Sequence, residues 1–451
     1  MLSGETDMTA QVDDLASGRR AKRALARTAA VLVALCSLTA GCSSAGEEMD
    51  VVWDTAADRK AEQTGNGAWL SGDTLVRSRF DAVSGYNAPT GKQSWEYIPP
   101  GRSAVCHATA DTDSSVLVLT RDGNGTSASG KSEVCATAVA LDMKNGREIW
   151  QAPLSPSESG LHRLQPYPVS AGSGIAVLLT KNELHAVDVR TGKARWKASL
   201  PKGCVPGRTM VAEHQVAALL ACGGTDNRWG DKIPRDAELH AAAFAPATGA
   251  LLWSTPLGGR TVIPWDARAE FVSADPLVVA ASQSGDSDSG AYFSFDGNGR
   301  PNPAIDSSGP YGEIQPDRRL TAAVDGGRLY AVTFHRVRNS RVDAYRLATF
   351  DLASGELLWG GTVDDDRLDR CHPYRILPRD GQLTILTVVP RDSGCGLHVL
   401  DAATGERRDG HTFPEGDDLP DTVFTYKDWF IGARYGSYWA PEKPFTAYER
   451  R

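Results

Sequence analysis

The stretch Ala186-Val187-Asp188-Val189-Arg190-Thr191-Gly192, followed by Trp196, is the clearest copy of a phrase that recurs through this sequence. Its pattern is Ala-x-Asp-x-x-Thr-Gly-x-x-x-Trp. The Asp side chain can accept hydrogen bonds from turn amides, and the Gly adopts positive φ without a clash of a Cβ atom. The phrase therefore predicts a tight hairpin between two β-strands.

Further copies of the phrase cover most of the chain. Ala140 to Trp150, Thr349 to Trp359 and Val399 to Asp409 keep the spacing, although the last copy lacks the Trp. Weaker copies end at Trp95 and Trp253, and a shortened one is Asp296-Gly297-Asn298-Gly299. The repeat glycines are Gly91, Gly146, Gly192, Gly249, Gly299, Gly355 and Gly405. A repeat of about 40 to 50 residues is typical of a β-propeller.

Each repeat is predicted to form one four-stranded antiparallel blade, with strands a to d. Two β-rich runs before each phrase, such as Gly174 to Thr180 and Leu184 to Val189, supply strands b and c. After the seventh phrase, Phe424 to Ile431 and Phe445 to Glu449 predict strands a to c of a further blade, and Asp50 to Trp53 has the pattern of its strand d. We therefore expect an all-β, eight-bladed propeller that is closed by strands from both termini, which removes its exposed edges.

The phrase resembles the pyrroloquinoline-quinone (PQQ)-type propeller repeat over residues 50–450. The resemblance implies that the strand d Trp docks against the Gly and Ala positions of the neighbouring blade. The repeat tryptophans are accordingly expected to be structural: Trp95, Trp150, Trp196, Trp253 and Trp359. Blades five and seven have Pro303 and Asp409 in place of the Trp, so looser packing is expected there. The resemblance concerns fold and does not by itself specify chemistry.

The N-terminal segment predicts an exported lipoprotein. Basic residues from Arg19 to Arg27 precede an uncharged stretch, Thr28 to Leu38, that is too short to span a bilayer. It leads into Leu38-Thr39-Ala40-Gly41-Cys42, which resembles the lipobox, in which the cysteine thiol is acylated. We expect residues 1–42 to be a signal peptide that ends at Cys42, 43–49 to be a flexible tether, and 50–451 to be one propeller domain. An ordinary cleaved signal without lipid is the alternative.

The charge of the chain limits the classes of partner that it is expected to bind. The formal net charge is −8 and stays negative when residues 1–42 are removed, so a nucleic acid partner is not expected. The expected partners are a membrane, through a diacylglycerol anchor on Cys42, and a protein or peptide. The expected location is outside the cytoplasm, at the cell membrane of a bacterium.

Six cysteines remain after Cys36 in the signal and Cys42 at the anchor. An even number in an exported protein suggests three disulfides, for which fifteen connectivities exist. In the blade alignment, the starts of strands a and c and the end of strand b share one end of a blade. The alignment therefore favours one pair within each of blades two, four and seven: Cys106 with Cys135, Cys204 with Cys222, and Cys371 with Cys395.

All three predicted disulfides fall on one face of the ring, which also carries the long b-to-c and d-to-a loops. We call it the long-loop face, and the opposite one the short-turn face. Elaborated, cross-linked loops are where a propeller is expected to bind a partner. Aromatic and basic candidates for that contact are Arg228, Trp229, Trp265, Tyr311, His335, Arg338, Tyr374, Tyr438 and Trp439. Any one of them is more often packing or solvated surface than a binding residue.

No catalytic residue, cofactor or metal site is predicted. A quinoprotein dehydrogenase would need, by resemblance, an acidic Ca²⁺ site beside the quinone, a catalytic Asp and a disulfide between adjacent cysteines, and the sequence has no Cys-Cys pair. The loops 122–125 and 285–289 contain possible Ca²⁺ ligands, but such loops are more often solvated. We therefore expect a non-catalytic binding or scaffold propeller, similar in architecture to the lipoprotein of the outer-membrane barrel-assembly machinery. A PQQ-dependent dehydrogenase is the alternative.

Overall fold

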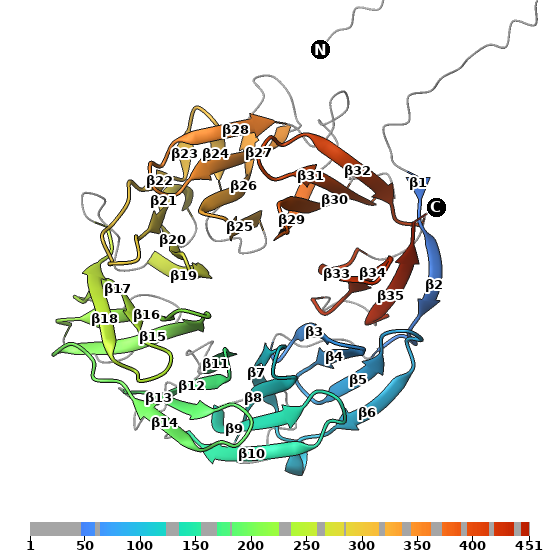
Figure 1. Cartoon of the computed structure of the whole chain (residues 1–451), viewed down its shortest axis with the longest axis horizontal. Helices are drawn as coiled ribbons and strands as arrows, with labels where there is room; N and C mark the ends of the chain where they lie inside the picture. The colour runs from blue at the N-terminus through green and yellow to red at the C-terminus, as the bar shows by residue number, and fades with distance from the viewer. Residues whose placement is uncertain are drawn as a thin grey trace, which may run out of the picture. The chain divides into compact units, whose positions relative to one another are not determined.

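Eight antiparallel sheets follow one another around a ring in the computed structural model, which confirms the predicted eight-bladed propeller (Figure 1). The described residues are 47–58, 64–122, 135–154, 169–180, 183–224, 236–258, 267–283, 286–314, 321–335, 344–361, 372–388, 395–414, 419–436 and 443–450. All of them belong to one compact unit, Ser44–Arg451.

The first four blades each contain four strands in sequence order, with strand a innermost. Blade one is β3 (Gly67–Ser71), β4 (Thr74–Ser78), β5 (Val83–Asn87) and β6 (Gln93–Tyr97). Blade two is β7 (Val105–Asp111), β8 (Val116–Asp122), β9 (Cys135–Asp142) and β10 (Glu148–Pro153), after the short 3₁₀ helix η1 (Pro100–Arg102). Blade three is β11 (Val169–Gly172), β12 (Ile175–Thr180), β13 (Glu183–Asp188) and β14 (Ala194–Lys197). Blade four is β15 (Cys204–Val211), β16 (Val216–Cys222), β17 (Glu238–Phe244) and β18 (Leu251–Pro256).

The last four blades depart from that plan in places. Blade five is β19 (Ala267–Ala274), β20 (Leu277–Gln283), β21 (Asp286–Ser294) and β22 (Ile305–Asp306). Blade six is β23 (Ser308–Gly309), β24 (Gly312–Ile314), β25 (Ala322–Asp325), β26 (Arg328–His335), β27 (Ala344–Asp351) and β28 (Leu357–Gly361). Blade seven is β29 (His372–Arg379), β30 (Gln382–Val388), β31 (Cys395–Asp401) and β32 (Arg407–Thr412). Blade eight is β33 (Thr422–Tyr426), β34 (Trp429–Ala433), β35 (Phe445–Glu449) and β2 (Asp50–Asp54).

The two chain ends close the ring as predicted. Strand β2 pairs antiparallel with β35, with Asp50 opposite Glu449 and Trp53 opposite Ala447. The Thr55 hydroxyl donates to the Phe445 carbonyl at 2.9 Å. The outer strand of blade eight, β2, therefore comes from the N-terminal part of the chain, and its three inner strands come from the C-terminal part.

One short strand was not predicted. β1 (Glu47–Glu48) pairs parallel with β32 of blade seven, and the Met49 N–H donates to Thr412 O at 3.0 Å. The Met49 side chain is 1% exposed and packs among residues of blades seven and eight. Residues 47–49, which the sequence had placed in a flexible tether, thus belong to the propeller.

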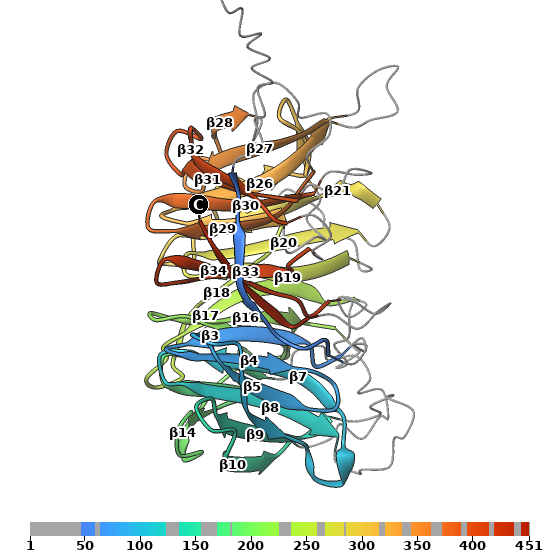
Figure 2. The same cartoon turned by 90° about the vertical axis from the view of Figure 1, so that its right-hand side faces the viewer.

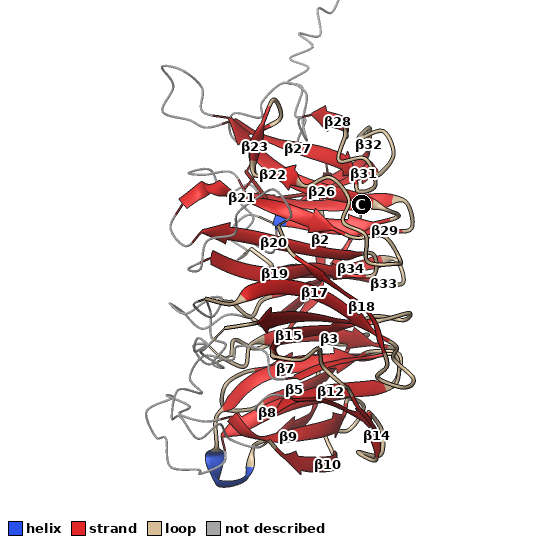
Figure 3. Cartoon of the chain, turned by 90° about the vertical axis from the view of Figure 1, so that its left-hand side faces the viewer, coloured by secondary structure: helices blue, strands red, loops and turns tan. Residues whose placement is uncertain are grey.

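Adjacent blades pack face to face through the apolar side chains of their b and c strands. Between blades four and five, for example, Leu219 and Ala241 share one buried cluster with Val279 and Phe293. Figures 2 and 3 show the ring from its side, and Figure 3 shows that strands make up nearly all the regular structure. The core is therefore a set of interfaces between blades, a different one for each neighbouring pair.

The strand d tryptophans connect each blade to the next. Trp196 of blade three is buried, its Nε1 donates to Pro246 O at 2.7 Å, and a Cβ on Gly249 of blade four would lie 2.5 Å from its ring. The same docking onto a repeat glycine joins Trp53 to Gly91, Trp95 to Gly146, Trp150 to Gly192, Trp253 to Gly299 and Trp359 to Gly405. The smaller Pro303 takes this place beside Gly355. The docking implied by the repeat is therefore confirmed.

Candidate functional site

The long-loop face carries two cross-links at strand ends. Cys106 at the start of β7 is bonded to Cys135 at the start of β9, with their Cα atoms 6.1 Å apart. Cys204 at the start of β15 is bonded to Cys222 at the end of β16, directly opposite it in the ladder. These are two of the three predicted pairs. Cys371 and the side chain of Cys395 lie outside the described residues.

The cross-links fix the points where the long loops leave the ring. In blade two, the disulfide joins strands a and c across β8, so both ends of the 123–134 connection start from fixed positions. In blade four, it joins strands a and b at the point where the 223–237 connection begins. A disulfide stabilises mainly by constraining the unfolded chain, by about 3 to 4 kcal/mol for loops of this size.

Six of the nine candidate contact residues lie outside the described residues: Arg228, Trp229, Trp265, Arg338, Tyr438 and Trp439. The remaining three are Tyr311, His335 and Tyr374. His335 is half-buried at the end of β26, and its ring lies against Gly312, where an added Cβ would be 2.7 Å from Nε2.

Tyr311 and Tyr374 are both half-buried, and the hydroxyl of each is hydrogen-bonded within the propeller. The Tyr311 hydroxyl donates to Asp306 O at 2.6 Å, and its ring meets Phe350 edge-on at 4.7 Å. Burial, together with Asp306, raises the pKa of Tyr311 to about 12. The Tyr374 hydroxyl donates to Pro420 O at 2.7 Å, across the junction of blades seven and eight.

A buried ionic network on the same face was not anticipated. Arg79, which follows β4, forms a two-bonded pair with Asp81, with Nε and Nη2 each 2.9 Å from a carboxylate oxygen, and it also pairs with Asp58. Arg77 is 4% exposed and lies 3.9 Å from Asp58. Burial lowers the pKa of Arg77 to about 10, against the opposing effect of Asp58.

The network continues into blade eight. Asp421 accepts hydrogen bonds from the N–H groups of Tyr435 and Gly436 at 2.5 and 2.8 Å. Burial is the main cause that raises the pKa of Tyr435. The sequence signal that could have indicated this network is Arg77-Ser78-Arg79, in which two arginines flank a serine at the end of an apolar strand. Because charges this deeply buried are stable only when paired, the network fixes the junction of blades one and eight at the long-loop face.

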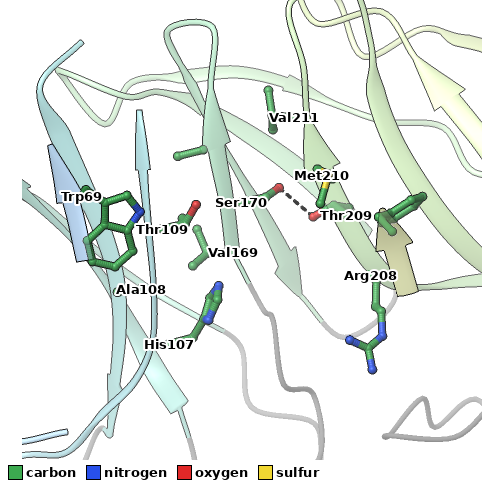
Figure 4. A pocket seen from close by; sticks show the side chains of 12 residues that line it. Trp69, His107, Ala108, Thr109, Val169, Ser170, Arg208, Thr209, Met210 and Val211 are labelled. Carbon is green, nitrogen blue, oxygen red and sulfur yellow. Dashed lines mark hydrogen bonds between the residues drawn. The ribbon is translucent and has the colours of Figure 1, made fainter. Parts of the chain in front are cut away.

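A cavity of about 240 Å³ lies between the inner strands of blades one to five (Figure 4). Its polar side chains include His107, Thr109, Ser170, Arg208 and Thr209, and the Ser170 and Thr209 hydroxyls are 2.9 Å apart. Its apolar side chains include Trp69, Met210 and Phe271. None of the twelve lining residues is an Asp or Glu. Arg208 is also within 3.5 Å of Glu270.

This cavity does not match the quinone site that the repeat resemblance implies. That site needs acidic Ca²⁺ ligands and a disulfide between adjacent cysteines, whereas this lining has no carboxylate and the two disulfides join separate strands. Within the described ranges, no group of three or more His, Cys, Asp or Glu side chains could hold a metal ion. The loops 122–125 and 285–289 lie largely outside those ranges. We therefore derive no chemical step through a quinone.

A second cavity, of about 500 Å³, opens at the short-turn face around β33. It is lined by Leu70 and Gly72 of blade one, Leu377 and Arg379 of blade seven, and Phe424 and Lys427 of blade eight, among others. No helix in the described parts of the chain is long and apolar enough to cross a membrane.

These features define an eight-bladed β-propeller of Trp-docked repeats with cross-linked strand ends on one face. The chain belongs to the family described as "Outer membrane protein assembly factor BamB", whose model matches residues 47–220 and 237–419. A quinone-dependent alcohol dehydrogenase subunit of Gluconobacter oxydans (strain 621H) is 24% identical over 170 residues. That match covers 33% of this chain and 21% of the relative, so the chain corresponds to about a fifth of the relative's length.

A solved structure agrees on the fold. The quinohemoprotein alcohol dehydrogenase of Comamonas testosteroni is similar with a TM-score of 0.50 at 12% identity, over 89% of this chain and 76% of that one. BamB of Moraxella catarrhalis gives a TM-score of 0.47 at 15% identity, over 88% of this chain and 98% of that one.

Proposed function

We propose that this chain is a membrane-anchored, extracytoplasmic lipoprotein whose propeller is a non-catalytic scaffold for a protein or peptide partner. The observation that carries the proposal is the placement of the disulfides Cys106–Cys135 and Cys204–Cys222 at the roots of long loops on one face. The ring already has a buried core between every pair of neighbouring blades. Cross-links confined to loop roots are better explained by a need for ordered loops.

The family description supports a protein partner, since it names an assembly factor. Contact through the long-loop face would use the candidates Arg228, Trp229, Trp265, Arg338, Tyr438 and Trp439. Their aromatic and guanidinium groups are the types that most often dominate binding energy at protein interfaces.

The partner face can be tested by photo-crosslinking in intact cells. A photoreactive amino acid would replace Trp229 or Trp439 on the long-loop face, and Asp380, in the exposed turn between β29 and β30, is the matched position on the short-turn face. We expect one discrete crosslinked protein from the first two positions and none from the third. Crosslinks from position 380 alone would contradict the assignment of the face.

The lipid anchor needs a separate test. Cys42→Ala should give an exported protein that enters the aqueous phase of a detergent extraction, whereas the unaltered chain enters the detergent phase. If the Cys42→Ala protein stays in the detergent phase, residue 42 is not the anchor.

A PQQ-dependent dehydrogenase is the second candidate, on the strength of the partial match to the alcohol dehydrogenase subunit. The lining of the 240 Å³ cavity does not favour it, because none of the twelve described residues that line this cavity is a carboxylate that could bind Ca²⁺. One experiment distinguishes the scaffold function from the dehydrogenase function. The purified protein is incubated with the quinone and Ca²⁺ and passed through gel filtration, and its absorbance spectrum is then recorded. Retention of the quinone absorbance at one equivalent would favour the dehydrogenase.

A further inference from the structure

The N-terminal strands place the start of the propeller at its outer perimeter. β1 pairs with β32, the outermost of the four main strands of blade seven, and β2 is the outermost strand of blade eight (Figure 1). The Met49 N–H bond to Thr412 and the burial of the Met49 side chain fix the segment between them. The chain therefore joins the ring at its rim, between blades seven and eight, and at neither face.

The covalent distance from the anchor to this rim is short. Five residues along the chain lead from Cys42 to Glu47, and an extended chain of five residues spans at most about 18 Å. A lipid on Cys42 would hold Glu47 within about 18 Å of the membrane surface. Lengthening that tether requires breaking the β1–β32 pairing and exposing Met49.

The opposite rim cannot approach the membrane in the same way. Blade four lies across the ring from blade eight, and its outer strand is β18 (Figure 1). Two blades of four strands, spaced about 4.8 Å apart, put these outer strands at least about 30 Å from each other, without counting the separation of the two inner strands. A short tether therefore selects one segment of the perimeter.

That segment exposes a pair of apolar side chains beside the tether. Val51 and Val52 on β2 are 44% and 38% exposed. The strands of this segment carry charges of both signs: Arg407 and Arg408 on β32 and Arg450 after β35, together with Glu47, Glu48 and Asp50. A mixed rim of this kind neither attracts nor repels a membrane strongly, so the tether and the two valines would determine the contact.

We propose that the rim of blades seven and eight around Val51 and Val52 rests on the lipid headgroups, with the propeller axis parallel to the membrane. The inference rests on the lipid anchor proposed at Cys42. Its consequence is that the long-loop face and the short-turn face both open sideways, and neither is covered by the membrane.

The test measures how close each rim is to the lipid. A fluorescent amino acid replaces Val52 or, as the matched control, Leu252 on β18, which is 53% exposed. The lipidated full-length protein is placed in phosphatidylcholine vesicles whose headgroups carry a quencher. We expect quenching at position 52 to exceed that at position 252 at least threefold. In a second form, about twenty Gly and Ser residues inserted between Gly46 and Glu47 should remove most of the difference.

The outcomes separate this inference from the anchor itself. Flotation of the unlabelled protein with vesicles is measured first, and failure to float contradicts the anchor. If the protein floats but both positions are quenched equally, or the inserted linker has no effect, the rim contact is wrong. A dimeric mass in vesicles with neither position quenched would show that a second copy covers the rim and would also overturn the proposal.

Discussion

The carboxylate of Asp409 lies 3.4 Å from the guanidinium of Arg450, at the one blade junction that has no c-to-d hairpin to receive a tryptophan. Asp409 occupies the strand d position that Trp359 occupies in blade six, opposite Val399. Blade eight takes its strand d from the N-terminus, so it has no repeat glycine for a Trp to dock on. Arg450, which also lies over the Phe430 ring, takes the place of that turn. The missing Trp of blade seven thus follows from the way the ring closes.

Asp409→Asn should weaken this junction in a pH-dependent way. Burial raises the pKa of Asp409, but hydrogen bonds from His411 and the Gly410 N–H, with Arg450, outweigh it and hold the pKa below its ordinary value. A depressed carboxylate pKa stabilises the fold above the unfolded value of about 3.9, and that stabilisation is lost as the pH falls through the folded value. Because the Asp409–Arg450 pair is partly exposed, we expect Asp409→Asn to lower the free energy of unfolding by about 0.5 to 1 kcal/mol at pH 7. At pH 3 we expect a smaller decrease.

Urea denaturation at the two pH values measures this effect. Glu356→Gln, which changes an exposed carboxylate in the c-to-d turn of blade six, serves as the control. An equal loss for Asp409→Asn at pH 7 and pH 3 would show that the ion pair is not the cause.

Gly249→Ala tests the docking of one blade on the next. Gly249 has φ of 69° and an added Cβ would lie 2.5 Å from the Trp196 ring. Gly174 has φ of 77°, but nothing lies within 4 Å of an added Cβ, so Gly174→Ala bears only the cost of the left-handed backbone, about 1 to 2 kcal/mol. We expect Gly249→Ala to lower the free energy of unfolding by at least about 1 kcal/mol more than Gly174→Ala does. Equal midpoints in chemical denaturation would mean that the Trp docking contributes little.

Deletion of residues 47–54 should open the ring. It removes β1 and β2, leaves the outer edge of β35 unpaired and exposes the site vacated by Met49. An unpaired edge promotes association between chains, so both a lower melting temperature and more light scattering on heating are expected. Deletion of 43–46 is the control, since it keeps both strands. Identical melting of the two truncations would argue against closure by β2.

Replacing both Cys204 and Cys222 by Ser should loosen the long-loop face more than it unfolds the ring. The 18-residue separation predicts a loss of about 3 kcal/mol in global stability. Hydrogen exchange should rise first in peptides from 223–237, which carry Arg228 and Trp229, while β16 and β17 stay protected. A rise spread evenly over all eight blades would instead indicate a purely global role.

Cys371 and Cys395 should form the third cross-link. Cys371 directly precedes β29 and Cys395 begins β31 in blade seven, much as Cys106 lies near the start of β7 and Cys135 begins β9 in blade two. Peptide mapping without reduction should recover one peptide that joins residues 371 and 395. Either cysteine bonded to a different blade would contradict the alignment of repeats.

The sequence predicted those parts of the structure that repeat. The Asp-x-x-Thr-Gly turns, the blade number and the β2–β35 closure were visible because each copy supports the others. Strand β1 was not predicted, because two residues carry no periodicity and their pairing with β32 depends on the completed ring. The broken inner strand of blade six, β24 and β25, was missed for the same reason.

The candidate site was less predictable than the fold. Cysteine positions gave two pairs that the structure contains, because strand register limits which cysteines can meet. Side-chain direction has no such constraint, so the hydrogen bonds of the Tyr311 and Tyr374 hydroxyls were not predicted and the Arg77–Asp58–Arg79 network went unnoticed. A buried charge can be recognised only when its partner is known, and the fold determines which residues become partners. Asp421, which acts on Arg77, is far from it in the chain.

The pairing of β2 with β35 also sets an order of events in time. β2 is synthesised long before β35 and can pair with it only after β35 has been made, since Thr55 and Phe445 are 390 residues apart. Contacts between such distant residues slow folding. A chain that is cut short during synthesis never acquires its partner for β2, so an unclosed ring with a bare strand edge is the form that the cell's proteases would meet.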